Sequence, residues 1–157
     1  MSSKLNLKSV ACIGCGVIGA GWVARFIENG VNIKIYDISD QSRQALDRTL
    51  TNAEIAYSNL TCLPRRHRGK AVFTTTISEA VKGVDLIIES IPERTEIKRL
   101  AYEEIEKECD TDTLIASSTS GILPSKLQKN MKRPERFFVG HPFNPVYLLP
   151  LVEVVAG

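Results

Sequence analysis

The sequence predicts a single α/β domain whose sheet is mostly parallel and doubly wound, with helices on both faces. Short apolar runs of strand length alternate along the chain with segments of helical periodicity. The run at residues 84–89 holds a continuous apolar stretch, as expected for a strand that helices cover on both faces. A glycine-rich turn joins the first predicted strand to the first predicted helix. Such alternation implies parallel strands linked by right-handed crossovers.

The N-terminal elements are predicted from apolar spacing and from the residues that end them. Residues 10–13 form a short apolar run, and residues 17–28 repeat apolar side chains on one helical face, with small residues that permit close packing on the sheet. Gly30 ends this helix, because glycine readily adopts the left-handed conformation that follows a helix. A second apolar run at residues 32–36 predicts the next strand.

The later elements follow from the same patterns. Ser39 or Asp40 caps a second helix, in which apolar side chains recur up to about Leu60. A further helix over residues 93–109 buries Ile97, Leu100 and Ile105, and residues 77–81 form a helical turn. The remaining strands are predicted at residues 72–74, 84–89, 114–116, 136–140 and 151–155. The 157 residues contain no internal repeat or linker, so we expect one domain.

A glycine turn followed by an acidic residue is the first pattern that indicates a ligand-binding site. The turn is Gly14-Cys15-Gly16-Val17-Ile18-Gly19, and Asp37 ends the second predicted strand, 18 residues after Gly19. Gly14 allows the sharp turn, Gly16 lets the backbone approach a pyrophosphate, and Gly19 lets the helix pack closely. The helix start offers unpaired N–H groups to phosphates, and Asp37 can accept hydrogen bonds from both adenosine ribose hydroxyls. The pattern predicts a Rossmann-type site for NAD rather than NADP, whose 2′-phosphate would meet the carboxylate; a glycine turn that only packs is the alternative.

Composition narrows the class of protein. Twenty Lys and Arg against eighteen Asp and Glu give a net charge of +2, which favours neither nucleic acid nor an anionic membrane as a partner. Cys12 and Cys15 form a C-x-x-C pair, but no second pair or histidine cluster completes a ligand set, so we expect free thiols and no metal. The apolar stretch at residues 10–24 superficially resembles a secretory signal but is better explained as a buried strand and helix, and no later run approaches the length of a membrane span. Free thiols suit a reducing compartment, and we expect a cytoplasmic protein.

The ends of the other strands supply further candidate site residues, because ligands of open parallel sheets bind beyond the carboxyl ends of the strands. Besides the glycine turn and Asp37, this rule selects Pro92 with Glu93, residues 117–120 and residues 141–144. In the second of these segments, the hydroxyls of Ser117, Ser118, Thr119 and Ser120 can bind the nicotinamide half of a cofactor or polarise a substrate oxygen. A serine-rich turn that caps a helix is the alternative.

His141 is the candidate catalytic base. It directly follows a predicted strand, and an imidazole suits the removal of a proton from an alcohol near neutral pH. Glu153 lies twelve residues later in an apolar strand, where a carboxylate needs a partner. Pairing the two would fix the imidazole tautomer and stabilise the imidazolium that forms on proton transfer. A structural histidine and a glutamate that faces water are the alternatives.

Four segments together resemble a known family. They are Gly14-Cys15-Gly16-Val17-Ile18-Gly19, Glu89-Ser90-Ile91-Pro92-Glu93, Ser117-Ser118-Thr119-Ser120 and His141-Pro142-Phe143-Asn144-Pro145. Over nearly its whole length the chain resembles the NAD-binding domain of the 3-hydroxyacyl-CoA dehydrogenase family. The resemblance implies that His141 deprotonates a 3-hydroxyl with Glu153 as its partner. It also implies that Ser120 and Asn144 contact the reacting end of substrate or cofactor, and that Glu93 and Lys98 bind the nicotinamide ribose.

Two departures from the acyl-CoA pattern bear on the expected substrate. The helical arm that reaches toward CoA in those enzymes is shortened here to the helix ending near Leu60 and the loop at residues 65–70, and Pro142 replaces the usual aromatic residue after the histidine. Both favour a small free 3-hydroxy acid. Within the family, residues 116–121 and 140–153 look most like the carnitine dehydrogenase branch. That likeness implies oxidation of L-carnitine to 3-dehydrocarnitine; a 3-hydroxyacyl-CoA dehydrogenase and a non-catalytic NAD-binding module remain as alternatives.

The resemblance also bears on domain organisation. Family members continue into a helical domain that completes the substrate pocket and forms the dimer. We therefore expect residues 1–157 to be the NAD-binding domain alone, with that second domain absent from the chain, and the full-length protein to be a homodimer. We expect the chain by itself to bind NAD with little or no turnover. The basic loop at residues 64–70, including His67, is interpreted as a solvated surface loop.

Overall fold

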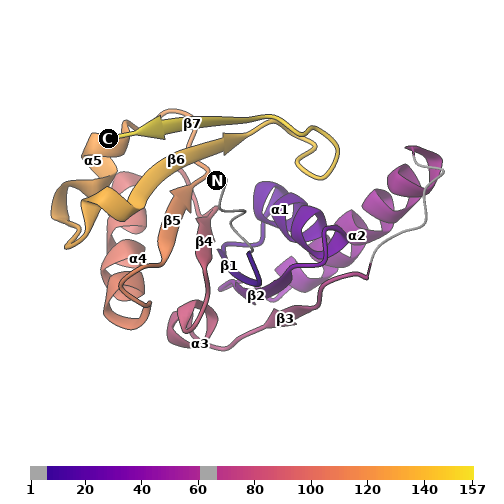
Figure 1. Cartoon of the computed structure of the whole chain (residues 1–157), viewed down its shortest axis with the longest axis horizontal. Coiled ribbons are helices and arrows are strands. Elements are labelled where there is room, and N and C mark those ends of the chain that lie inside the picture. The colour runs from indigo at the N-terminus through magenta and orange to yellow at the C-terminus, as the bar shows by residue number, and fades with distance from the viewer. Residues whose placement is uncertain (1–6, 61–66) are drawn as a thin grey trace, which may run out of the picture.

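A computed structural model gives the fold and describes residues 7–60 and 67–157. Seven strands form one sheet in the order β3-β2-β1-β4-β5-β6-β7, with helices on both faces (Figure 1). All neighbouring pairs from β3 to β6 are parallel, and β7 runs antiparallel to β6. The strands are β1 Ser9–Ile13, β2 Asn32–Tyr36, β3 Ala71–Phe73, β4 Leu86–Glu89, β5 Leu114–Ser117, β6 Phe137–Pro142 and β7 Val152–Ala156. The prediction of a doubly wound, mostly parallel sheet is confirmed.

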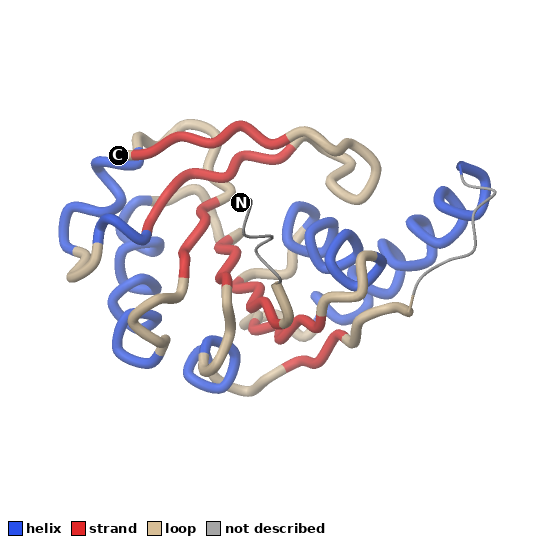
Figure 2. Tube along the Cα trace, viewed as in Figure 1, coloured by secondary structure: helices blue, strands red, loops and turns tan. Residues whose placement is uncertain are grey.

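The helices divide between the two faces of the sheet (Figure 2). They are α1 Val17–Glu28, α2 Gln41–Leu60, α3 Ile77–Val81, α4 Thr95–Glu108 and α5 Pro124–Leu127, followed by the 3₁₀ turns η1 Gln128–Asn130 and η2 Pro134–Arg136. Alternate residues of the strands point to opposite faces, so Val10 and Cys12 of β1 pack with α1 and α2, while Ala11 and Ile13 pack with α3, α4 and α5. The sheet therefore separates two apolar cores.

Local signals set the ends of the N-terminal helices. Gly30 has a φ of +81° directly after the end of α1, as predicted. At the start of α2, the Ser39 hydroxyl accepts a hydrogen bond from the backbone N–H of Gln41 at 3.3 Å, so Ser39 rather than Asp40 supplies this contact. Leu46 and Ala53 of α2 are buried, as their spacing predicts.

The structure corrects the predicted orientation of α4. Leu100 was expected in the core but is 66% exposed, and Ile97 is only partly buried, whereas Lys98 is 1% exposed. The buried face of α4 carries Lys98, Ala101, Tyr102, Ile105 and Glu106. The apolar spacing predicted the wrong face because Lys98 is buried beside the carboxylate of Glu89 on β4. Leu100 instead lies at the surface, where it borders a groove.

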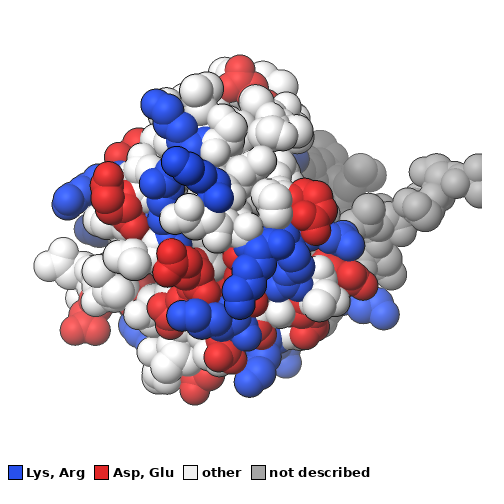
Figure 3. All heavy atoms as spheres, turned by 90° about the vertical axis from the view of Figure 1, so that its left-hand side faces the viewer, with Lys and Arg blue, Asp and Glu red and all other residues white. Residues whose placement is uncertain are grey.

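Charge is spread over the surface without segregation on the face that α4 and α5 form. Figure 3 shows Lys and Arg interspersed there with Asp and Glu. The part of the basic loop at residues 64–66 lies outside the described residues. His67 is exposed, and Arg68 forms ion pairs with Glu28 at 3.2 Å and Glu54 at 2.6 Å. None of the helices within residues 7–60 and 67–157 is both long enough and apolar enough to cross a bilayer.

Candidate functional site

The three glycines of the turn differ in what a Cβ atom at each position would meet. Gly14 has a φ of +89°, and a Cβ there would lie 2.7 Å from the carbonyl oxygen of Ser90. A Cβ on Gly19 would lie 2.0 Å from the carbonyl oxygen of Gly14, so only glycine lets α1 approach the turn this closely. A Cβ on Gly16 would meet no protein atom within 4 Å. Protein packing therefore explains Gly14 and Gly19 but leaves the space beside Gly16 open to a ligand.

The start of α1 has the properties of an anion site. Gly16 is its N-cap residue, and no side chain caps the helix through a hydrogen bond. Val17 is 72% exposed, and Ile18 is partly buried. A helix start of this kind presents backbone N–H groups and the positive end of the helix dipole to solvent. It fits the pyrophosphate of a dinucleotide.

Asp37 is held in place by the turn itself. Its Oδ2 accepts a hydrogen bond from the backbone N–H of Cys15 at 2.5 Å, and its Oδ1 accepts one from the backbone N–H of Ser39 at 2.7 Å. Each carboxylate oxygen can accept more than one hydrogen bond, so capacity remains for ribose hydroxyls. The side chain is thereby oriented at the end of β2, where the sequence predicted a ribose contact.

The surroundings of Cys12 and Cys15 indicate a role in packing rather than in chemistry. Both thiols are fully buried, and the Cys12 thiol lies 3.3 Å from the carbonyl oxygen of Gly14. Burial, with the nearby charge of Asp37, raises the pKa of the Cys15 thiol to about 12. Such a thiol stays protonated near neutral pH, which makes it a poor nucleophile or metal ligand. Among the described residues, no group of three or more His, Cys, Asp or Glu side chains could hold a metal ion.

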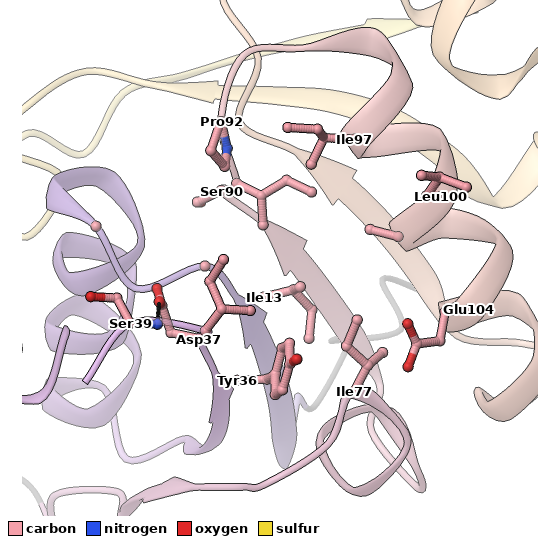
Figure 4. A pocket seen from close by; sticks show the side chains of 15 residues that line it. Ile13, Tyr36, Asp37, Ser39, Ile77, Ser90, Pro92, Ile97, Leu100 and Glu104 are labelled. Carbon is pink, nitrogen blue, oxygen red and sulfur yellow. Dashed lines mark hydrogen bonds between the residues drawn. The ribbon is translucent and has the colours of Figure 1, made fainter. Parts of the chain in front are cut away.

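A groove of about 680 Å³ opens beside the turn (Figure 4). One side is formed by Gly14 and Gly16 with Asp37 to Ser39, and the other by Pro92 and by Ile97, Leu100, Ala101 and Glu104 of α4. Pro92 lies at the rim, where the sequence predicted a cofactor contact. The groove places the predicted phosphate and ribose contacts next to an apolar wall that can pack against a base.

A buried glutamate that the sequence analysis did not select organises the next part of the site. Glu89, at the end of β4, has no exposed surface. Its Oε1 accepts from Lys98 Nζ at 2.6 Å and from the backbone N–H of Ile91 at 2.9 Å. Its Oε2 accepts from Ser117 Oγ at 2.6 Å and from Tyr102 Oη. Burial and the Glu89 charge raise the pKa of Tyr102, so this hydroxyl remains a hydrogen-bond donor. An acidic residue at the end of an apolar strand was the available sequence signal.

Lys98 lies inside the protein between two carboxylates. Besides Glu89 Oε1, its Nζ approaches Glu93 Oε2 at 3.4 Å and donates to the carbonyl oxygen of Ile91 at 3.2 Å. A buried ammonium needs such partners, because an unpaired one carries a large desolvation cost. A direct contact from Lys98 to the nicotinamide ribose stays a prediction; in this structure Lys98 contacts Glu93, which is itself a predicted ribose ligand.

Glu93 links the start of α4 to the turn after β5. Its Oε1 accepts from Thr119 Oγ1 and from the backbone N–H groups of Ser120 and Gly121, both at 3.1 Å. Burial acts to raise the pKa of Glu93, but these hydrogen bonds and the Lys98 charge outweigh it, so the pKa lies below its usual value. Ser120 is exposed on this turn, with its backbone fixed by Glu93.

The hydroxyl group of Ser118 is hydrogen-bonded to a side chain of α1. Its Oγ accepts a hydrogen bond from Trp22 Nε1 at 3.2 Å and lies 2.9 Å from Ser90 Oγ. It is partly buried between these two side chains. Trp22 lies within the predicted helix at residues 17–28 but was not selected from the sequence as a site residue. A contact between Ser118 and a cofactor remains a prediction.

His141 and Glu153 form the predicted pair. The two residues are directly opposite in the antiparallel register of β6 and β7, and His141 Nδ1 lies 2.8 Å from Glu153 Oε2. The side chains are 33% and 59% exposed. Ser117 of β5 is opposite Val139 of β6, so His141 lies two residues further toward the edge of the sheet that carries Ser120. Glu153 is therefore paired with His141 and at the same time faces water from the edge strand β7.

The loop between β6 and β7 carries Asn144 and packs against α1 and α2 (Figure 1). Val146 is buried so close to α1 that a Cβ on Gly21 would lie 2.9 Å from its Cβ. The carbonyl oxygen of Tyr147 accepts hydrogen bonds from Arg25 Nη1 at 3.2 Å and from Tyr57 Oη. Asn144 is exposed three residues after His141. These anchors, which the sequence analysis did not identify, hold the loop that carries Asn144 and follows His141 at the end of β6.

Comparison with known proteins decides the family. The sequence profile described as "3-hydroxyacyl-CoA dehydrogenase, NAD binding domain" matches residues 9–157. The chain belongs to this family. Its fold and its cofactor, NAD, are those predicted from the glycine turn and Asp37.

The relatives include enzymes named for carnitine. The chain is 52% identical over 152 residues to an L-carnitine dehydrogenase/betainyl-CoA thioesterase of Rhizobium meliloti, covering 97% of the chain and 31% of that protein. It is 44% identical over 151 residues to an L-carnitine dehydrogenase of Oceanobacillus iheyensis, covering 96% of the chain and 49% of that protein. The chain thus spans less than half the length of these family members.

Solved structures of other dehydrogenases have the same fold. A 5-formyl-3-hydroxy-2-methylpyridine 4-carboxylic acid 5-dehydrogenase, described as an NAD⁺-dependent dismutase, superposes with a TM-score of 0.87 at 37% identity, over 96% of this chain and 49% of that one. A 3-hydroxybutyryl-CoA dehydrogenase of Escherichia coli K12 superposes with a TM-score of 0.81 at 31% identity, over 96% of this chain and 32% of that one. The predicted family resemblance is confirmed.

Proposed function

We propose that the chain is the NAD-binding domain of an enzyme that oxidises the 3-hydroxyl of L-carnitine to 3-dehydrocarnitine. The observation that carries the proposal is the hydrogen bond between His141 Nδ1 and Glu153 Oε2, 2.8 Å long, at the edge of the sheet that also carries the glycine turn. A module that only bound NAD would need neither side chain. The identity of 52% to a relative named for L-carnitine dehydrogenase activity supports carnitine as the substrate.

The cofactor-binding part of the proposal rests on how the residues fit NAD. The open space beside Gly16 and the uncapped start of α1, with Cys15, Val17 and Ile18, would hold the pyrophosphate. Asp37 would accept hydrogen bonds from the adenosine ribose. Further along the edge, Ser118 and Glu93, with Lys98 behind it, would orient the nicotinamide half. When bound, NAD supplies the acceptor for the hydride that leaves C3 of the substrate.

The proton steps belong to His141. If Nδ1–H donates to Glu153 Oε2, the lone pair of Nε2 is free to accept the proton of the substrate hydroxyl. The carboxylate of Glu153 then stabilises the imidazolium that results. Ser120 and Asn144 offer hydrogen bonds to the substrate oxygen as it becomes a carbonyl oxygen. Proton and hydride leave the same CH–OH group, which balances the oxidation.

Under this proposal, residues of a second domain complete the substrate site and form the interface between subunits. We infer that a helical domain like that expected from the family supplies the contacts to the ammonium group and the contacts of a homodimer, in a cytoplasmic enzyme. Apolar side chains on and beside β7, including Leu151 at 54% and Val154 at 68% exposure, support a covering element at this edge.

The test compares substrates with the complete product of the gene that encodes this chain. NADH formation is measured with L-carnitine and with 3-hydroxybutyryl-CoA, each over a range of concentrations. The proposal predicts that kcat/KM is larger for L-carnitine. Faster oxidation of the CoA ester would instead support the 3-hydroxyacyl-CoA dehydrogenase alternative. NAD binding without oxidation of either substrate would support the non-catalytic alternative.

A further inference from the structure

The groove beside Asp37 extends well beyond the residues that would hold a ribose. Its long wall is a stripe on α4 formed by Ile97, Leu100, Ala101 and Glu104, which share one side of the helix because they are spaced by three or four residues. From Ile97 to Glu104 this wall runs for about 10 Å along the helix. Glu104 lies near Ile77 at the end of the groove remote from Pro92 (Figure 4).

Glu104 is a polar group in a mainly apolar groove. Its side chain is exposed and lines the groove. Within residues 7–60 and 67–157, no side chain or backbone group forms a hydrogen bond or ion pair with it. The residues around it, Ile77, Leu100 and Ala101, can pack against the faces of an aromatic base but cannot recognise its polar edge. A carboxylate at this position accepts hydrogen bonds and donates none.

A nucleoside bound at Asp37 would extend its base toward Glu104, because both residues line the same groove. A ribose whose hydroxyls reach Asp37 directs the base away from the pyrophosphate, along the wall of α4. The six-membered ring of the purine would then lie on the side of Glu104, with the group at C6 on its outer edge. In adenine this group is an amine, which donates hydrogen bonds, whereas in hypoxanthine it is a carbonyl, which a carboxylate repels.

We propose that Glu104 accepts a hydrogen bond from the 6-amino group of adenine and so makes the groove selective for adenine over purines with a carbonyl at C6. The proposal rests on NAD binding by this chain, as stated under the proposed function. It assigns a specificity role to a residue on the exposed face of α4. The backbone turn and Asp37, by contrast, recognise phosphate and ribose, which NAD and its deaminated analogue share.

The test measures dissociation constants of NAD and of nicotinamide hypoxanthine dinucleotide for the 157-residue chain by calorimetry. The unchanged chain is expected to bind NAD at least about fivefold more tightly than the analogue, as a single charge-assisted hydrogen bond at an exposed site allows. In Glu104→Ala the two dissociation constants should agree within about twofold. Glu104→Gln should also narrow the ratio, because its amide can donate to the carbonyl of hypoxanthine.

Glu103→Ala is the matched control, since Glu103 is the neighbouring exposed glutamate on α4 but does not line the groove. It should keep the ratio of the unchanged chain, and far-ultraviolet circular dichroism should show that all variants fold. Equal affinities in the unchanged chain, or a ratio that survives Glu104→Ala, would overturn the role of Glu104 alone. Failure of the unchanged chain to bind NAD would overturn the proposed function together with this inference.

Discussion

His141 and Glu153 face each other across the antiparallel pair of β6 and β7, with His141 Nδ1 2.8 Å from Glu153 Oε2. A direct cross-strand register fixes this contact, so it does not depend on a flexible loop. The partner of Nδ1 determines which nitrogen of the ring is free, and under the proposed function the free nitrogen, Nε2, accepts the proton of the substrate.

Replacing Glu153 by Gln should therefore lower catalysis more than binding. Glutamine keeps the size of the side chain but cannot stabilise the imidazolium as a carboxylate does. We expect kcat of the complete gene product to fall about 100-fold, within the range for general-base catalysis, with the NAD dissociation constant unchanged. Glu135→Gln, an exposed change near the opposite end of β6, is the control. Equal kcat in the two variants would contradict the role of Glu153.

The glycine turn offers a paired prediction, because Gly16 and Gly19 differ in what surrounds them. Gly19→Ala places a Cβ 2.0 Å from the carbonyl oxygen of Gly14, and we expect it to lower the free energy of unfolding by about 2–3 kcal/mol. Gly16→Ala meets no protein atom within 4 Å and should change stability by less than about 1 kcal/mol. Its methyl group should nevertheless weaken NAD binding at least about tenfold, equivalent to ~1.4 kcal/mol. Urea unfolding and calorimetry measure the two effects; unchanged NAD affinity in Gly16→Ala would refute the pyrophosphate site.

Asp37 should set the preference between NAD and NADP. Asp37→Asn removes the charge that would repel a 2′-phosphate while an amide oxygen can still accept from the backbone N–H of Cys15. We expect the ratio of NADP to NAD affinity to rise about tenfold, equivalent to ~1.4 kcal/mol. Asp40→Asn, an exposed change three residues away, should leave the ratio as it is. A ratio that does not respond to Asp37→Asn would place the adenosine ribose elsewhere.

Glu93 should make stability depend on acid pH. Hydrogen bonds from Thr119 and the backbone outweigh the effect of burial and lower the pKa of Glu93 in the folded protein below its usual 4.5. The folded state therefore binds fewer protons, so the contribution is complete above the unfolded-state pKa and is lost as pH falls through the folded value. We expect Glu93→Gln to lose less unfolding free energy than the unchanged chain between about pH 6 and about pH 3. Glu103→Gln serves as the charge-matched control; a pH dependence that Glu93→Gln leaves unaltered would refute the account.

Much of the fold follows from local sequence signals. The glycine turn, Asp37 and Gly30 act through backbone conformation and nearby residues, so their places could be predicted. The pairing of His141 with Glu153 could be proposed because a carboxylate in an apolar strand needs a partner. The short elements at residues 124–136 were missed, because helices of three or four residues carry too little periodicity to be detected.

Other features depend on tertiary partners that are distant in sequence. Lys98 is buried because Glu89 and Glu93 pair with it, and this turns Leu100 outward against the apolar pattern of α4. The loop that carries Asn144 is placed by Val146 against Gly21 and by Arg25 and Tyr57 at Tyr147. Side-chain spacing within one element cannot reveal such contacts. Each partner residue, considered alone, has the pattern of an ordinary surface or core residue.

The most direct test of the central claim is the effect of His141→Asn on the complete gene product. NADH formation from L-carnitine is measured at saturating substrate, and the NAD dissociation constant is measured on the same preparation. The account predicts that kcat falls by about 10³-fold or more while the NAD dissociation constant stays within about twofold. Turnover within about tenfold of the unchanged enzyme, with NAD still bound, would show that another group removes the proton.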